Sequence, residues 1–142
     1  MWPEGAVAAA GWRLIDLPTV IDDRGSVTFA DSARDLPFEV KRVYQLYDVP
    51  PDAIRAGHAH RSCAQCLIAA SGSFRVSLDD GLVRDQLRLA TRGQALYVPA
   101  AVWLSLDHFS AGAVCLVLAS RHYDQADYWL DYEEFIAARR QA

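Results

Sequence analysis

The sequence predicts an all-β domain, a double-sheet β-barrel of the jelly-roll kind that ends in a short helix. Short segments with the alternation of strands follow one another at intervals of roughly 8–12 residues. Turn-forming residues separate them, and Asp79-Asp80-Gly81 is the strongest hairpin signal. Only the C-terminal stretch differs, because apolar residues between positions 130 and 136 recur among charged ones at the spacing of an amphipathic helix. This combination favours a jelly roll.

The composition sets the size and class of the protein. A chain of 142 residues that is 52% hydrophobic and 23% charged suits one domain over residues 1–142, with residues 1–10 as a flexible terminus. A net charge of -4 argues against a nucleic-acid or anionic-membrane partner. No segment approaches the ~20 apolar residues of a membrane span, so we expect a cytoplasmic protein.

The strands of the first half are expected in this order. Trp12–Asp16 alternates weakly and suits an edge strand, and the turn at Asp22–Gly25 leads into a strand over Ser26–Phe29. In the next strand, residues 38–49, alternation puts Arg42 and Tyr44 on the same face. Further strands are expected at residues 65–70, 73–78, 82–89, 95–98, 102–106 and 114–119, the last of them buried on both faces.

The stretch from Arg55 to Gly72 concentrates the chemistry. His58 and His60 are separated by one residue, so in an extended segment both rings project from the same face. A lone histidine on a strand is most often structural, but a pair flanked by Arg55 and Arg61 indicates proton chemistry, because the unperturbed pKa of histidine lies near neutrality. His108 and His122 lack such a context, and we expect no catalytic role for them.

The three cysteines, Cys63, Cys66 and Cys115, are an odd number in a chain without an export signal. Cys63 and Cys66 have the C-x-x-C spacing, but a redox pair would normally begin a helix, whereas the run that follows is typical of a strand. We therefore expect buried thiols, with a redox or zinc pair as the less favoured alternative.

Two motifs resemble those that hold the metal in cupin barrels, a His-x-His pair with a glutamate shortly afterwards and a second motif, G-x5-P-x-G-x2-H. Here the first keeps His58 and His60 but has Gln65 in the glutamate position. The second keeps Gly93 and Pro99, has Ala101 for its second glycine and Leu104 where the histidine would fall. A neutral amide and an aliphatic side chain cannot replace a carboxylate and an imidazole, so the sequence predicts a barrel without metal or other cofactor.

The chain resembles the dTDP-sugar 3,4-ketoisomerases of the cupin superfamily, which also occur as WxcM-like C-terminal domains. The resemblance covers nearly the whole chain and depends on these segments: Asp23-Arg-Gly25, Pro37-Phe38, Lys41-Arg-Val-Tyr44, Arg55-x-x-His58-Ala-His60-Arg61, Gln65-x-Leu67-Ile68, Asp79-Asp-Gly81, Val102-Trp103, Phe109-Ser110, Leu118-Ala-Ser120, Tyr123-Asp124, Asp127-Tyr128 and Asp131-Tyr-Glu-Glu-Phe135. It implies a cupin jelly roll, a homodimer, and a reaction that moves the 4-keto group of dTDP-4-keto-6-deoxyglucose to carbon 3 without metal or organic cofactor.

The resemblance also implies roles for particular residues. His60 is expected to be the principal acid–base group and His58 its partner, while Tyr44 donates to the developing oxyanion. The substrate-binding residues are expected to be Arg42, Arg55, Arg61, Gln65 and Trp103. Each arginine also suits an ordinary surface charge, and Trp103 suits core packing as well as sugar stacking. Tyr97 is expected in the core.

Two departures from the family pattern bear on catalysis. Ala56 stands after Arg55 where glycine is commoner, and Leu104 follows the tryptophan where many relatives have a histidine. Loss of that acid–base group leaves one alternative open, a sugar-nucleotide-binding or regulatory cupin without activity. A metal-dependent cupin oxygenase or isomerase is a third hypothesis, and Gln65 and Leu104 disfavour it.

Overall fold

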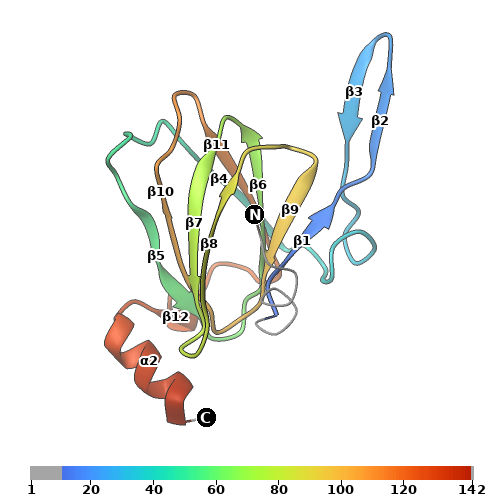
Figure 1. The fold of residues 1–142 in the computed structure, drawn as a ribbon. Helices are drawn as coiled ribbons and strands as arrows, with labels where there is room; N and C mark the ends of the chain where they lie inside the picture. The colour runs from blue at the N-terminus through green and yellow to red at the C-terminus, as the bar shows by residue number, and fades with distance from the viewer. Residues whose placement is uncertain (1–10, 142) are drawn as a thin grey trace.

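A computed structural model describes residues 11–141 of the protein, which form two antiparallel five-stranded sheets and one separate hairpin (Figure 1). In chain order the elements are β1 Arg13–Asp16, β2 Thr19–Asp22, β3 Gly25–Thr28, β4 Arg42–Tyr47, β5 Arg55–His60, β6 Gln65–Ser71, β7 Phe74–Asp79, β8 Arg84–Leu89, β9 Gln94–Val98, β10 Trp103–Asp107, β11 Val114–Ala119, the 3-10 turn η1 Gln125–Asp127, β12 Tyr128–Trp129 and α2 Tyr132–Gln141.

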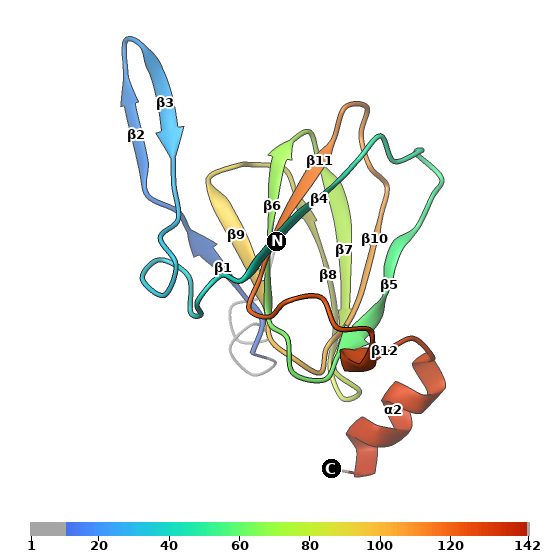
Figure 2. The same ribbon diagram turned by 180° about the vertical axis from the view of Figure 1, so that it is seen from behind.

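The first sheet has the strand order β1-β9-β6-β11-β4 and the second the order β12-β5-β10-β7-β8. Neighbours in the sheets are often far apart in sequence, as expected of a jelly roll, where the chain crosses between two facing sheets. The views from the two sides show the sheets enclosing a barrel, with the hairpin β2–β3 projecting at one end and α2 packed at the other (Figures 1 and 2). The predicted all-β fold with a C-terminal helix is confirmed.

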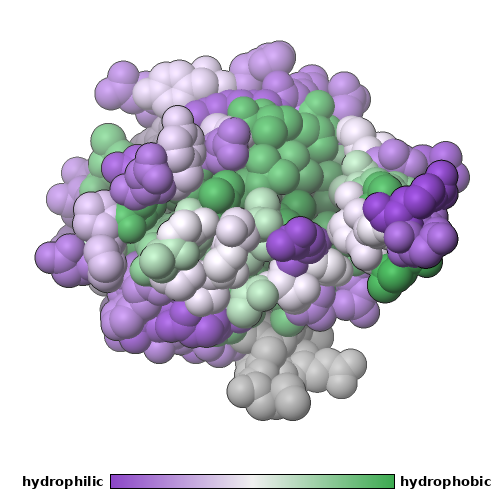
Figure 3. Space-filling view, turned by 90° about the horizontal axis from the view of Figure 1, so that it is seen from above, coloured by the Kyte–Doolittle hydropathy of each residue, from purple (hydrophilic) through white to green (hydrophobic). Residues whose placement is uncertain are grey.

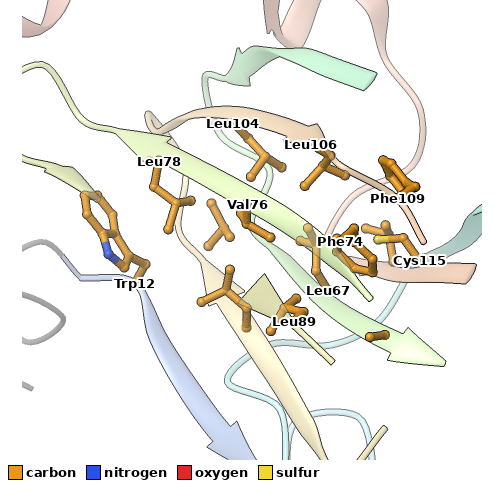
Figure 4. Close-up of a cluster of buried hydrophobic side chains, with 14 of the residues drawn as sticks. Trp12, Leu67, Phe74, Val76, Leu78, Leu89, Leu104, Leu106, Phe109 and Cys115 are labelled. Carbon is orange, nitrogen blue, oxygen red and sulfur yellow. The ribbon is translucent and has the colours of Figure 1, made fainter. Parts of the chain in front are cut away.

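The core lies between the two sheets and follows from the alternation of the strands. On β7 the burial pattern alternates strictly, so that Phe74, Val76 and Leu78 point inward. Phe74 stacks on Phe109 with ring centroids 5.2 Å apart. Figure 4 shows these side chains meeting Leu67 and Leu104 from the other strands. Fully burying a side chain of this size contributes about 1.5–3 kcal/mol, so this cluster is a major source of stability.

Most strands begin or end within two residues of their predicted limits, but one is much shorter than expected. Of residues 38–49 only Arg42–Tyr47 forms a strand, β4. The Asp22–Gly25 turn closes a hairpin whose second strand, β3, was predicted, whereas its first strand, β2, was not. Residues 1–10, expected to be a flexible terminus, lie outside the described residues.

The helix α2 is capped at its N-terminus and joined to the second sheet near its C-terminus. Its first turn begins at Asp131, whose carboxylate accepts a hydrogen bond from the Glu134 amide at 3.0 Å. Near its other end, Arg139 donates to the Asp80 carbonyl at 2.9 Å, in the turn between β7 and β8. Its buried residue Phe135 packs against the outer face of β5. No helix within residues 11–141 is long and apolar enough to cross a membrane.

Candidate active site

A cavity of about 350 Å³ opens between β4 and β5, the strands where the two sheets meet on one side of the barrel. Its inner wall is apolar, and its polar groups come from β4, β5 and β12. The lining residues are Arg42, Tyr44, Leu46, Ile54, Arg55, Ala56, His58, Leu67, Leu104, Leu106, Val117 and Tyr128. A cavity that combines an apolar wall with a few convergent polar groups is a common form of small-molecule site.

The histidines reach this region from the second half of β5. Ala56 and Gly57 both have φ of +68°, and the pairing of β5 with β10 shifts register at this point. The bulge re-aims the strand before the histidines. As predicted, both rings project from the same face of the strand, which is turned to the inside of the barrel, and their centroids lie 4.9 Å apart. His58 lines the cavity, whereas His60 lies behind it and is only 6% exposed.

His60 lies between a carboxylate and an aromatic ring, both supplied by the C-terminal stretch. Its Nδ1 lies 3.4 Å from Oδ2 of Asp127, a close electrostatic approach rather than a well-aligned hydrogen bond. The Tyr128 ring lies 4.3 Å from the His60 ring and 4.8 Å from that of His58. The carboxylate of Asp127 is itself held by the amides of Ser62 and Cys63, at 2.9 and 3.1 Å.

The two histidines have different electrostatic surroundings. Burial lowers the pKa of His58 to about 4, and the neighbouring His60 adds to this effect. Burial also lowers the pKa of His60, but Asp127 opposes this change because its charge favours the imidazolium. Hydrogen bonds from Ser62 and Cys63 outweigh the effect of burial on Asp127 and lower the pKa of its carboxyl. His58 is therefore neutral at pH 7, and His60 alone has a carboxylate that stabilises its charged form.

Tyr44 is held in place by two neighbours. Its hydroxyl accepts a hydrogen bond from Nε2 of Gln65 at 2.6 Å, and the Arg42 guanidinium lies 4.5 Å from its ring centroid. Burial raises the pKa of Tyr44 to about 12, and the nearby Tyr128 adds to this shift. Tyr44 therefore keeps its proton at neutral pH and can donate a hydrogen bond. Arg42 also donates to the Tyr128 hydroxyl at 3.4 Å, which links both tyrosines to one cation.

Of the predicted site residues, the structure gathers Arg42, Tyr44, Arg55 and the two histidines around the cavity. The other three lie elsewhere. Gln65 is 2% exposed and touches the site only through Tyr44. Strand alternation turns Trp103 away from the inward Leu104, so that Trp103 packs against Tyr132 and Phe135 outside the barrel. Arg61 lies over the ring of Trp129. None of these three residues lines this cavity, and that they contact substrate stays a prediction.

The donors around the cavity do not fit a metal ion. Within residues 11–141 there is no group of three or more His, Cys, Asp or Glu side chains that could hold one. The amide of Gln65 is engaged by Tyr44, and Leu104, at the position of the cupin histidine, offers only an aliphatic side chain. The three cysteines are buried as free thiols in the described part of the chain, so Cys63 and Cys66 form no disulfide.

Sequence reasoning missed two residues of the site, Asp127 and Tyr128. They lie 67 and 68 positions after His60 in sequence and reach it only because β12 pairs with β5, which sets Tyr128 opposite His60. The one signal for them was the Asp127-Tyr128 segment in the family resemblance, which carried no role for either. A two-residue strand has no periodicity that a sequence could reveal.

Comparison with known proteins identifies the family of the chain. Residues 10–140 match the family described as FdtA: WxcM-like, C-terminal. The TDP-4-oxo-6-deoxy-alpha-D-glucose-3,4-oxoisomerase of Aneurinibacillus thermoaerophilus is 38% identical over 123 residues, which cover 87% of this chain and 88% of the relative.

Solved structures of sugar 3,4-ketoisomerases have the same fold. QdtA from Thermoanaerobacterium thermosaccharolyticum, in complex with TDP, superposes with a TM-score of 0.89 at 32% identity, covering 92% of this chain and 95% of QdtA. The WlaRB TDP-quinovose 3,4-ketoisomerase of Campylobacter jejuni gives a TM-score of 0.85 at 37% identity, covering 89% of this chain and 97% of WlaRB. The chain therefore belongs to the FdtA family of WxcM-like C-terminal domains.

Proposed function

We propose that the protein is a 3,4-ketoisomerase acting on dTDP-4-keto-6-deoxyglucose, without metal or other cofactor. The relatives are named for this kind of reaction, and a histidine-to-asparagine mutant of QdtA has been solved in complex with TDP-4-keto-6-deoxyglucose. The observation that carries the proposal is the contact of His60 with Asp127, beside the neutral His58 and next to a cavity with an apolar inner wall. This is an acid–base arrangement suited to moving protons on a ketone.

The reaction needs only proton transfers. A base removes the proton from carbon 3, and the electron pair of the C–H bond forms the C3–C4 double bond of an enediol as oxygen 4 takes up a proton. Oxygen 3 then loses its proton, the carbonyl forms at carbon 3, and carbon 4 is protonated. The net change moves the carbonyl from carbon 4 to carbon 3, and no electrons enter or leave.

We assign the first proton transfer to His60, because Asp127 stabilises the imidazolium that forms when the ring takes a proton. His58, which lines the cavity and is neutral at pH 7, suits the transfer of protons between the two oxygens. Tyr44 is protonated and suits a hydrogen bond to the developing oxyanion. Arg42 and Arg55 suit the negative charge of the diphosphate, since a protein with a net charge of -4 needs local cations to bind an anion.

Incubating the protein with dTDP-4-keto-6-deoxyglucose in deuterated water, and following carbon 3 and carbon 4 by NMR, tests the assignment. The wild type should form the 3-keto product and incorporate deuterium. His60→Asn should abolish exchange at carbon 3 and leave the affinity for TDP nearly unchanged, because asparagine cannot cycle a proton near pH 7. If His60→Asn exchanges as fast as the wild type while His58→Asn does not, the two roles are reversed.

A non-catalytic sugar-nucleotide-binding protein is the second candidate, and Leu104 favours it. The side chain of Leu104 is buried in the cavity wall, where many relatives have a group that can transfer a proton. Binding of the sugar nucleotide without any deuterium incorporation by the wild type would establish this alternative. Conversion of the substrate would exclude it.

We also propose that the protein is a homodimer in which the hairpin β2–β3 of one subunit packs against the first sheet of the other. The hairpin projects from the barrel, and Val20, Ile21 and Val27 on it are between 56% and 76% exposed. Such exposure is unfavourable for a free arm and typical of an interface.

The first sheet offers an apolar surface that a second copy of this hairpin would fit. A groove of about 370 Å³ on its outer face is lined by Leu17, Phe29, Ile68, Leu116 and Leu118 among others. From the end toward which the hairpin points, a hydrophobic hollow bordered by hydrophilic side chains is visible (Figure 3). Because both surfaces belong to one chain, two copies can exchange contacts reciprocally and close a dimer.

Sedimentation distinguishes a monomer from the proposed dimer. The wild type should sediment as a dimer at micromolar concentration, and Ile21→Asp should give a monomer because it buries a carboxylate in an apolar contact. Leu82→Asp is the matched control, since Leu82 is 80% exposed but lies in the turn between β7 and β8. A monomeric wild type would refute the dimer and leave the assignment of the site untouched.

A further inference from the structure

The two-residue strand β12 has two functionally different faces. Tyr128 pairs with His60 and Trp129 pairs with Ala59. Because side chains alternate along a strand, Tyr128 points inward against the two histidines and Trp129 points outward. The inward face belongs to the proposed site, whereas the outward face packs on a small buried cluster between β5 and α2.

Two neighbours contact the Trp129 ring on this outward face. The guanidinium carbon of Arg61 lies 4.2 Å from the ring centroid, within the range of a cation–π interaction. The ring of Phe135, from α2, meets Trp129 edge-on with centroids 5.3 Å apart. Phe135 is fully buried, so this side of the contact is fixed. Arg61 is exposed, whereas the Trp129 ring is half-buried.

Arg61 is also tied to the same segment through the main chain. Its amide donates to the Asp127 carbonyl at 2.7 Å, immediately before β12 begins. Arg61 therefore holds the segment from Asp127 to Trp129 at two points, one through the backbone and one through the side chain. Only the contact of the side chain with the Trp129 ring requires an arginine at this position.

We propose that Arg61 is a positioning residue, which by holding Trp129 places the Tyr128 ring and the Asp127 carboxylate against His60. The inference rests on the proposed acid–base role of His60. It replaces the prediction that Arg61 binds substrate, because its side chain lies on the outside of β5 and does not line the cavity. A substrate diphosphate would meet Arg42 and Arg55 there instead.

The titration of His60 gives a measure of this positioning that does not depend on turnover. The groups that face its ring are Asp127, Tyr128, His58 and, at longer range, Arg42. Of these, Asp127 alone raises the pKa of His60. If the segment loosens and the carboxylate retreats, the pKa of His60 falls. Removing the positive charge of Arg61 would by itself raise the pKa of His60. The direction of the change therefore separates a loosened segment, which lowers this pKa, from the loss of the charge alone.

The experiment compares the wild type with Arg61→Met, Arg61→Lys and Arg13→Ala. Methionine keeps the apolar stem without the charge, and lysine restores a cation over the ring. Arg13, which lies 5.2 Å from the ring centroid of Tyr97 on β9, is a matched cation–π pair away from the site. Each protein is labelled with ¹⁵N-histidine and titrated by NMR, and kcat, KM and the affinity for TDP are measured on the same samples.

Arg61→Met should lower kcat about fivefold to tenfold, lower the pKa of His60, and leave KM and TDP affinity within about twofold. Arg61→Lys should recover most of kcat, and Arg13→Ala should change none of these quantities. Weaker TDP binding with an unchanged His60 titration would identify Arg61 as a substrate contact and overturn the proposal. Unchanged kcat, KM, TDP affinity and His60 pKa in Arg61→Met would also overturn the proposal and would leave Arg61 an ordinary surface charge.

The thermal midpoint of each variant shows whether it folds. If Arg61→Met fails to fold, Trp129→Phe takes its place, because phenylalanine keeps an aromatic ring on the outward face. The same fall in the His60 pKa is expected for it. If the wild type does not convert dTDP-4-keto-6-deoxyglucose, the proposed activity fails. The His60 titration still decides whether Arg61 positions this segment.

Discussion

Acid should destabilise the protein measurably through one side chain, His58. Burial lowers its pKa to about 4, whereas in the unfolded chain it titrates near its ordinary value of about 6.5. Between these values the unfolded state binds more protons than the folded state, so stability falls as the pH falls. From pH 7 to pH 5 the difference amounts to about 2 kcal/mol for a fully shielded ring. Because the His58 ring borders the open cavity, water screens part of this effect, and we expect about 1 kcal/mol.

The assay is urea unfolding at pH 7 and pH 5 for the wild type and for His58→Asn, whose side chain does not titrate. Taking the difference between the two proteins cancels the acid sensitivity of the shared groups that lie far from His58. His60, whose ring centroid lies 4.9 Å from that of His58, is present in both proteins. The wild type should lose about 1 kcal/mol more than His58→Asn between the two pH values. His122→Asn, which removes an exposed histidine, is the control and should behave as the wild type. Equal losses in the wild type and His58→Asn would refute the assignment of a neutral, buried His58.

Three further substitutions test the local structure. Ala56→Gly should stabilise the protein by about 0.5–1 kcal/mol in urea unfolding, because φ of +68° strains alanine and suits glycine; a loss of stability would contradict the bulge. Gly81→Ala should destabilise it by about 1–3 kcal/mol, because the added Cβ would lie 2.7 Å from Cβ of Arg139 at φ of +96°, and hydrogen exchange should show α2 loosened first. Phe74→Ala should destabilise it by about 3–5 kcal/mol, seen as a lower Tm, since its ring is fully buried against Phe109; a change below 1 kcal/mol would show that the core is packed differently.

The strands on which the site is built could be predicted because their signals are local. The apolar run over residues 114–119, the alternation over residues 73–78 and the turn at Asp79–Gly81 depend on neighbours in sequence, and the structure has these elements within a residue of their expected limits. Burial on both faces was expected for β11, but its side chains alternate between buried and half-buried. Alternation also predicted correctly that the two histidines share a face, as do Arg42 and Tyr44.

Which face a side chain occupies relative to the barrel depended on more than alternation. Trp103 and Leu104 are adjacent, and their sequence did not reveal that the leucine would line the cavity and the tryptophan pack under α2. The family resemblance implied that Arg61 and Gln65 contact substrate. Tertiary contacts give them different neighbours, Trp129 and Tyr44.

By itself, then, the sequence determined the class of fold, the histidine pair and the residue types around it, because these depend on short-range periodicity and on the chemistry of single side chains. Only the tertiary structure decided that Asp127 and Tyr128 complete the site. Their approach to His60 requires the pairing of a two-residue strand with a partner 67 or more positions away, and no local pattern records which distant segments will pair. The difference in pKa between the two histidines has the same origin, since burial and the nearest carboxylate are properties of the folded chain.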